Sequence, residues 1–155
     1  MKLKNPLLVV TDIGKSVEFY RNVLGLDVIL DFGANKTLSG GLCLQTLETY
    51  KDFIGTDRIT FGANNAEIYF EEDDFDGFAE KLKLLNIEYV HPVIEHSWGQ
   101  RVVRFYDPDH HIIEVGENME MVCWRFLESG MSPQQTAERM DVPLEYVIAA
   151  AEKKK

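Results

Sequence analysis

The chain has 155 residues, enough for one compact domain or for two small modules that share a core. Hydrophobic residues make up 45% of the chain and charged residues 27%, proportions that are typical of a soluble globular protein. The formal net charge of −10 argues against binding to nucleic acid or to an anionic membrane surface, because both need clustered basic residues.

The two cysteines, Cys43 and Cys123, do not have the spacing of a zinc site, and we expect both to be reduced thiols. The first apolar run ends at Asp12, which is too early for the hydrophobic segment of a signal peptide or for a membrane span. Together these observations predict a cytoplasmic protein that binds neither a membrane nor nucleic acid.

The first part of the chain has the periodicity of one helix among four strands. Ile13, Val17, Tyr20 and Leu24 recur at helical spacing, and Gly25 follows them as a residue suited to end a helix. The predicted elements are a strand ending at Asp12, a helix over 13–24, and strands over 27–32, 36–39 and 41–47.

Residues 48–65, which contain Gly55, Asp57 and the cluster Gly62-Ala63-Asn64-Asn65, are predicted to link this module to a second one with the same order of elements. The predicted elements of the second module are a strand over 67–72, a helix over 73–85, and strands over 88–93, 101–106 and up to Val115. The sequence H-S-W-G-Q over 96–100, which we call the rim loop, separates the second of these strands from the third. The turn D-P-D-H separates the third from the last.

Residues 119–155 lie outside both modules and are predicted to be helical. The first helix spans 119–128, Ser132 and Gln135 have the pattern of a capped helix start, and Pro143 begins another helix. The last two helices resemble a helix-turn-helix, but their surroundings are acidic. We therefore expect this extension to pack against the sheet or a second subunit rather than to read DNA.

The two modules can be aligned with each other, and the alignment pairs four oxygen-bearing side chains. An offset of 62 residues places Asn5 on Glu67, and an offset of 69 residues places Gln45 on Glu114. Each pair occupies one position in a repeated strand-helix-strand-strand-strand module. Folding the modules about a pseudo-twofold axis would bring the four side chains together, so we predict a site there.

Strand alternation places further candidate side chains on the same face as these four. Tyr69 lies on that face, and so does Arg104. Arg104 would either anchor an anionic group of a substrate or pair with one of the two glutamates. His96 and Trp98 in the rim loop would stack on a ligand, and the alternative for Trp98 is a buried ring that anchors the loop.

Two motifs accompany the two-module plan: T-D-I-G-K-S-V-E-F-Y-R-N-V-L-G-L over 11–26 and W-G-Q-R-V-V-R-F-Y-D-P-D-H-H-I-I-E-V over 98–115. Together they resemble the vicinal oxygen chelate superfamily, from Asn5 to about Glu117. The resemblance implies an α+β fold in which two βαβββ modules form a curved eight-stranded mixed sheet with a cup-shaped site. It implies a glyoxalase-like domain over 1–118, with modules at about 1–48 and 64–118, and a C-terminal helical extension over 119–155.

In metal-dependent members of this superfamily the ligands come from the first and last strands of each module, which correspond here to Asn5, Gln45, Glu67 and Glu114. Two amides and two carboxylates favour Mg, Mn or Ca over Zn or Fe as the one divalent ion. The family commonly has histidine at the positions of Asn5 and Glu67, and this departure argues against iron-dependent dioxygenase chemistry. A metal-free polar floor, with Arg104 neutralising the carboxylates, is an equally coherent interpretation.

The resemblance thus implies two functions of different classes. One is a metal-dependent lyase or isomerase of the glyoxalase I type, in which the ion polarises a substrate carbonyl and Glu67 or Glu114 moves protons. The other is a metal-free protein of the bleomycin-resistance type that binds and sequesters a small molecule such as a drug. A third interpretation is a regulatory protein whose C-terminal helices fill or cover the cup. The expected partners are a small-molecule ligand and a second copy of the chain in a homodimer.

Overall fold

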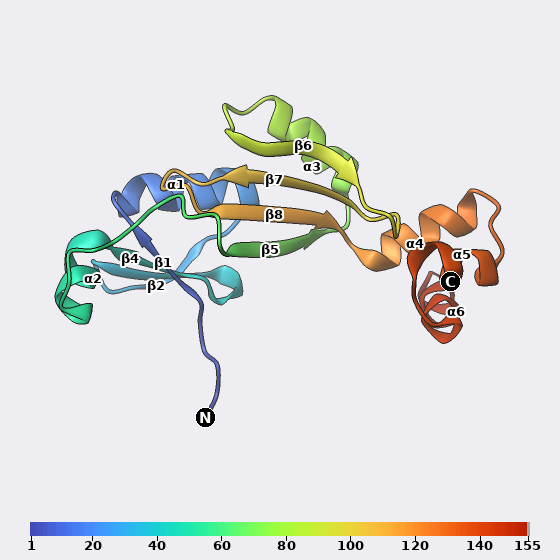
Figure 1. Ribbon diagram of the computed structural model, residues 1–155, viewed down its shortest axis with the longest axis horizontal. Helices are drawn as coiled ribbons and strands as arrows, with labels where there is room; N and C mark the ends of the chain where they lie inside the picture. The colour runs from blue at the N-terminus through green and yellow to red at the C-terminus, as the bar shows by residue number, and fades with distance from the viewer. Residues whose placement is uncertain (155) are drawn as a thin grey trace. The chain divides into compact units, whose positions relative to one another are not determined.

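A computed structural model describes residues 1–154, and Lys155, the last residue of the predicted extension, lies outside the described residues. The element order confirms the α+β fold with two βαβββ modules followed by helices (Figure 1). The first module contains β1 (Leu7–Val10), α1 (Ile13–Leu24), β2 (Val28–Asp31), β3 (Asn35–Leu38), a 3₁₀ turn η1 (Ser39–Gly41) and β4 (Cys43–Thr46). The second contains β5 (Glu67–Glu72), α3 (Phe75–Lys83), β6 (Tyr89–Glu95), β7 (Arg101–Tyr106) and β8 (Ile112–Glu117).

The strands are hydrogen-bonded into two four-stranded mixed sheets, where the sequence analysis predicted a single eight-stranded sheet. Each module completes its own ladder, in the orders β1-β4-β3-β2 and β5-β8-β7-β6. The chain divides into two compact units: the first comprises Met1–Glu67 and Tyr106–Ile112, and the second comprises Ile68–Phe105 and the chain from Ile113 onward.

In the first unit, β1 runs parallel to β4, and β3 joins β4 antiparallel. Val9 lies beside Gln45 in this register, which places Gln45 on the predicted face of β1. Helix α1 begins at the N-cap Asp12, whose carboxylate accepts a hydrogen bond from the backbone N–H of Lys15. It ends at Gly25, whose φ of 70° confirms the predicted glycine stop.

The D-P-D-H turn joins the first unit through two buried carboxylates. Asp109 accepts hydrogen bonds from the backbone N–H and the hydroxyl of Thr11, at 3.1 and 2.6 Å. Asp107 accepts one from the Tyr20 hydroxyl at 2.8 Å and lies 2.9 Å from His111 Nδ1. These bonds tie the turn to the start and the middle of α1.

The predicted linker over 48–65 is wrong in its first part, because helix α2 (Leu47–Ile54) occupies it. Leu47, Tyr50 and Ile54 recur at helical spacing, and Glu48 lies in the first turn, where the helix dipole favours a carboxylate. Gly55 ends the helix with a φ of 67°. The glycine that indicated a linker is therefore the C-cap of a helix.

In the second unit, α3 covers one face of the β5-β8-β7-β6 sheet. Its Phe78 ring lies 6.4 Å from the Phe105 ring of β7, and Val103 is buried on the same side of that strand. Successive residues of a strand point to opposite faces, so Arg104, between Val103 and Phe105, points away from α3. This confirms the predicted assignment of faces in β7.

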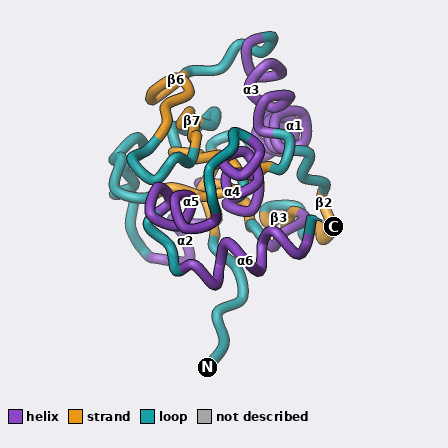
Figure 2. Tube along the Cα trace, turned by 90° about the vertical axis from the view of Figure 1, so that its right-hand side faces the viewer, coloured by secondary structure: helices purple, strands orange, loops and turns teal. Residues whose placement is uncertain are grey.

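The extension folds into three helices, α4 (Met119–Glu128), α5 (Pro133–Met140) and α6 (Leu144–Lys153), which lie together in Figures 1 and 2. They share a core of buried residues: Val122, Cys123, Phe126, Ala137, Met140, Val147 and Ala150. The Ser132 and Gln135 side chains form the predicted capping box at the start of α5. Within residues 1–154, no helix is long and apolar enough to cross a membrane.

Candidate functional site

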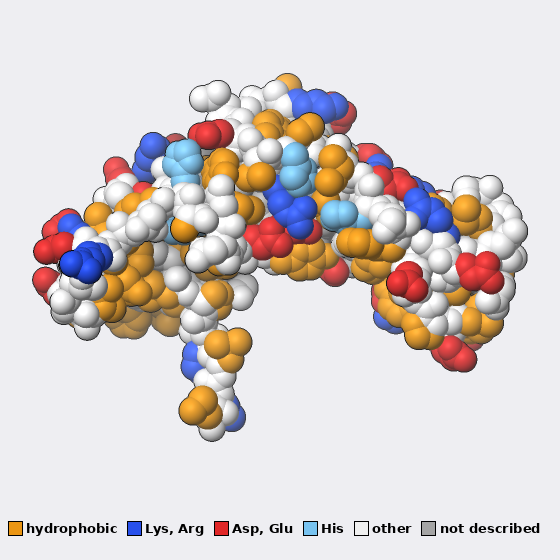
Figure 3. Space-filling view, viewed as in Figure 1, with side chains coloured by type: hydrophobic (Ala, Val, Ile, Leu, Met, Phe, Trp, Pro, Cys, Tyr) orange, Lys and Arg blue, Asp and Glu red, His pale blue; other side chains and the backbone are white. Residues whose placement is uncertain are grey.

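The face of the second unit's sheet that points away from α3 carries an ion pair between Arg104 on β7 and Glu114 on β8. The Glu114 side chain is 7% exposed and that of Arg104 is 23% exposed, so the pair is largely shielded from water. The register of β6 against β7 places His91 beside Arg104, and His91 Nε2 lies 3.2 Å from Arg104 Nη1. In Figure 3, histidine, basic and acidic side chains gather over this sheet, next to hydrophobic surface.

The rim loop over 96–100 adds an aromatic pair beside these charges. The backbone N–H groups of His96 and Gly99 donate to Gln100 O and His96 O, at 2.9 and 2.8 Å, and close a tight turn. The His96 and Trp98 rings stack with centroids 4.2 Å apart and an interplanar angle of 18°. Trp98 remains 36% exposed, so the alternative of a buried anchoring tryptophan is wrong.

Gln100 joins the rim loop to the strands. Its side chain accepts a hydrogen bond from Trp98 Nε1 at 3.2 Å and donates to the Tyr69 hydroxyl at 2.9 Å and to Glu117 O at 3.0 Å. Gly116 leaves room for this bridge, because a Cβ there would lie 2.8 Å from Gln100 Nε2. The Tyr69 hydroxyl in turn donates to Glu71 Oε1 at 3.1 Å.

The surroundings of His96 and Tyr69 keep both rings uncharged beside the Arg104–Glu114 ion pair. Burial, together with the positive charge of Arg104 and the nearby His91, lowers the pKa of His96 below its ordinary value. Burial is also the main cause that raises the pKa of Tyr69, with Glu71 adding to it. Both side chains are therefore uncharged at neutral pH and available for stacking and hydrogen bonding.

The structure places three of the four predicted metal ligands in the first unit and Glu114 in the second. Asn5 precedes β1 and donates its amide to Gly41 O. Gln45 accepts from Asn35 at 2.8 Å and donates to Thr49. Glu67 is exposed at the start of β5.

These contacts do not fit the predicted metal set. A ligand must offer an oxygen to the ion, but Gln45 Oε1 is engaged by Asn35 and the Glu114 carboxylate by Arg104. Within residues 1–154, histidine, cysteine, aspartate and glutamate do not gather in groups of three or more suited to a metal. Asn5 and Gln45 would bind through amide oxygens, which are not among these residue types, so metal binding by the four residues stays a prediction.

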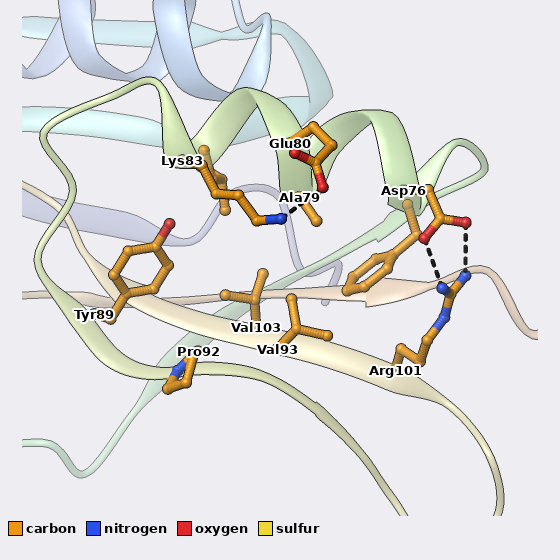
Figure 4. Close-up of a pocket in the computed structure, with 11 residues that line it drawn as sticks. Asp76, Ala79, Glu80, Lys83, Tyr89, Pro92, Val93, Arg101 and Val103 are labelled. Carbon is orange, nitrogen blue, oxygen red and sulfur yellow. Dashed lines mark hydrogen bonds and ion pairs between the residues drawn. The ribbon is translucent and has the colours of Figure 1, made fainter.

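A groove of about 450 Å³ lies on the opposite face, between α3 and strands β6 and β7 (Figure 4). Its apolar floor includes Phe75, Val93 and Val103. Ion pairs between Asp76 and Arg101 and between Glu80 and Lys83 stand along its rim. Acidic and basic groups thus alternate there, and the groove favours neither sign of charge.

Sequence reasoning missed two residues of the candidate site, His91 and Gln100. His91 belongs to it because of the register between β6 and β7, and a sequence does not show which residues pair across strands. Gln100 was part of the rim-loop motif, but its role depends on three partners that lie up to 31 residues away in the chain. The signal that could have found it is its position two residues after Trp98 in the rim loop.

Comparison with known proteins agrees with this architecture. Residues 3–120 match the model of a glyoxalase-like domain. The uncharacterized protein YraH of Bacillus subtilis is 29% identical over 129 residues, which cover 74% of this chain and 97% of YraH. A crystal structure of a protein of unknown function from Agrobacterium tumefaciens is 38% identical, with a TM-score of 0.69, and covers 76% of this chain and 94% of that one. A lactoylglutathione lyase from Agrobacterium tumefaciens, at 22% identity and a TM-score of 0.60 over 76% of this chain and 94% of its own, shares the fold.

Proposed function

Because the chain belongs to the glyoxalase-like domain family, we propose that it binds a small planar molecule on the β5-β8-β7-β6 sheet, without a metal ion. The observation that carries this proposal is the Arg104–Glu114 ion pair. It neutralises the carboxylate that a metal ion would need and leaves a polar floor under the rim loop. A divalent ion would have to displace Arg104 from a largely buried partner, which costs free energy.

The side chains of the site indicate the chemistry of the ligand. The exposed Trp98 ring, stacked on a neutral His96, offers an apolar surface to a flat ring. The Arg104 guanidinium can donate hydrogen bonds, which suits a carbonyl or other oxygen acceptor on that ring. Such a ligand gains both contacts without separating Arg104 from Glu114.

The competing proposal is a metal-dependent lyase or isomerase, with Glu67 and Glu114 as the catalytic groups. A bound divalent ion would supply Lewis acidity to a substrate carbonyl. This proposal requires the Glu114 carboxylate to separate from Arg104. It is supported by the repeat, which pairs Asn5 with Glu67 and Gln45 with Glu114. The lyase with the same fold is too distant in sequence to transfer its activity.

Both proposals can be tested by measuring the binding of flat aromatic carbonyl compounds to chelator-treated protein, followed by addition of Mg²⁺ or Mn²⁺. Metal-free binding is expected in the chelated protein and is expected to be unchanged by the ions. Trp98→Leu should weaken it roughly two- to tenfold, the usual contribution of one aromatic pair. Phe53→Leu removes an exposed aromatic ring from α2 and should leave the affinity unchanged. Binding or turnover that appears only after metal is added would instead support the lyase or isomerase.

A further inference from the structure

The C-terminal extension holds the rim loop, although the matched family domain ends where the extension begins. The family match stops at residue 120, and the relatives align over nearly their full length while covering about three quarters of this chain. Helices α4 and α5 nevertheless contact residues of the glyoxalase-like domain within the second unit. They are therefore an addition that touches the candidate site's own loop.

Two arginines of the extension donate hydrogen bonds to backbone carbonyls of the rim loop. Arg125 on α4 donates to Gly99 O at 2.6 Å, and Arg139 on α5 donates to Ser97 O. Both carbonyls lie in the segment that presents His96 and Trp98. The loop's conformation thus depends on donors that come from 26 and 42 residues further along the chain.

Each arginine is itself anchored to the sheet. Arg139 pairs with Glu95 at the end of β6 at 2.7 Å, and Arg125 pairs with Glu117 at the end of β8 at 2.8 Å. Burial favours a higher pKa for Glu117, but hydrogen bonds from Arg101 and Arg125 outweigh it and hold the pKa below its ordinary value. The anchor of Arg125 therefore stays charged at neutral pH.

Phe126 fills the space between the two arginines and the loop. The guanidinium carbons of Arg125 and Arg139 lie 4.9 and 5.3 Å from the centre of its ring. A Cβ at Gly99 would come within 2.3 Å of Phe126 Cζ, and Gly99 has a φ of 88°. The loop backbone therefore approaches the extension as closely as a glycine allows.

We infer that Arg125, Phe126 and Arg139 form a clamp that positions the rim loop and so sets the affinity of the site for its ligand. The inference rests on the proposed function for the ligand, while the clamp itself rests on the contacts above. Arg139 is the positioning residue to test, because its side chain is partly exposed and the bundle's buried core does not include it. Its loss should free the loop and leave the three helices packed.

The test compares the full-length variants Arg139→Met and Lys154→Met by amide hydrogen exchange. Lys154 is a matched control: like Arg139 it makes one ion pair, with Glu128, and lies over one aromatic ring, Trp124, at 5.4 Å, but both partners are within the extension. In Arg139→Met, the amides of His96 and Gly99 should exchange at least about tenfold faster, while the amides of the α6 core stay protected. Lys154→Met should leave the loop unchanged.

The conservative variant Arg139→Lys separates positioning from charge. A lysine can keep the ion pair with Glu95 but has no planar fork to reach Ser97 O at the same time, so it should restore only part of the loop protection. Glu95→Gln removes the charge that Arg139 and Arg125 both pair with, at 2.7 and 3.7 Å, but leaves both donors to the loop in place. It should therefore speed exchange in the loop while α6 stays protected. It serves as the second variant if Arg139→Met folds poorly.

A second experiment measures binding of the aromatic carbonyl compound for which the wild-type protein has the highest affinity. Arg139→Met should weaken it about three- to tenfold, comparable to losing the Trp98 stack, and Lys154→Met should not. Unchanged loop exchange in Arg139→Met, or equal loss of protection in the loop and in α6, would overturn the clamp. If the wild type binds no such compound, the proposed function fails, and the exchange data still decide the clamp by themselves.

Discussion

At the scale of single residues, the Arg104–Glu114 ion pair determines the character of the candidate site. Glu114 occupies the position of a ligand in the repeat, yet its side chain is 7% exposed and paired with a cation from the neighbouring strand. A carboxylate in such surroundings needs a compensating charge. In this protein the compensation is supplied by the chain itself.

Replacing Arg104 with methionine keeps most of the side-chain volume and removes the charge. We expect Arg104→Met to lower the free energy of unfolding by about 2 to 3 kcal/mol, near the lower end for a broken buried pair because Arg104 is partly exposed. Urea unfolding measures the loss. The double variant Arg104→Met with Glu114→Gln should recover much of it, because no uncompensated carboxylate remains. A stable single variant would show that the pair is not shielded as described.

The free energy of unfolding should depend on pH through the Asp107 carboxylate. Burial favours a higher pKa for Asp107, but hydrogen bonds from His111 and Tyr20 outweigh it and keep the pKa below its ordinary value. A lowered folded pKa means that the ionised group stabilises the fold above its unfolded pKa of about 3.9, and that this contribution is lost as the pH falls through the folded value. The stability difference between wild type and Asp107→Asn should thus be present at pH 5 and shrink as the pH falls below about 4.

Urea unfolding across this pH range, with the exposed Asp57→Asn as the control, measures that difference. The control should stay within about 0.5 kcal/mol of wild type throughout. A difference between wild type and Asp107→Asn that grows towards acid pH would contradict the assignment.

At the scale of elements, the start of α5 shows how local sequence signals support the clamp. Ser132 accepts a hydrogen bond from the backbone N–H of Gln135 at 3.2 Å, and the Gln135 side chain accepts one from the Ser132 N–H at 2.9 Å. This capping box determines where α5 begins and hence where Arg139 lies along it. A local motif therefore contributes to a contact 42 residues away in the chain.

Ser132→Ala removes the cap while leaving the apolar face of α5 intact. We expect it to cost about 1 kcal/mol, the usual loss for a serine cap replaced by alanine, and to increase hydrogen exchange in the first turn of α5. Gln134→Ala, on the exposed side of the same turn, should cost no more than about 0.5 kcal/mol. Equal effects of the two substitutions would show that the cap does not stabilise the helix.

At the scale of the whole molecule, the edge strands leave apolar side chains in water. Ile29 on β2 is 59% exposed and Phe32 just after it 72%, while Val93 and Ile94 on β6 are 42% and 41% exposed. Strands β2 and β6 are edges of their sheets, and an exposed apolar edge favours pairing with another chain. The prediction of a homodimer from the sequence thus has a specific surface to test.

Light scattering over a concentration series is expected to give the mass of a dimer. Lysine on an edge opposes pairing, so Ile29→Lys or Val93→Lys should shift the mass towards the monomer. Thr60→Lys, at an exposed position outside the strands, should not. A monomer mass for the wild type at all concentrations would exclude the homodimer.

The sequence by itself determined the elements and their order, because helix spacing, strand alternation, glycine stops and the Ser132 cap are local signals. It also placed Arg104 and Glu114 on one face of their strands. It failed at α2, where Gly55 served as a helix cap in a stretch predicted to be a linker. Both cap and linker use glycine, so the residue type alone does not distinguish them.

Only the tertiary structure decided that Arg104 pairs with Glu114, that His91 and Gln100 belong to the candidate site, and that the extension grips the rim loop. These contacts join residues on different strands or helices, and several span more than 20 positions of the chain. Their formation depends on strand register and on how helices pack, which are set by the free energy of the whole fold. The local spacing of residues in the sequence therefore does not predict these contacts.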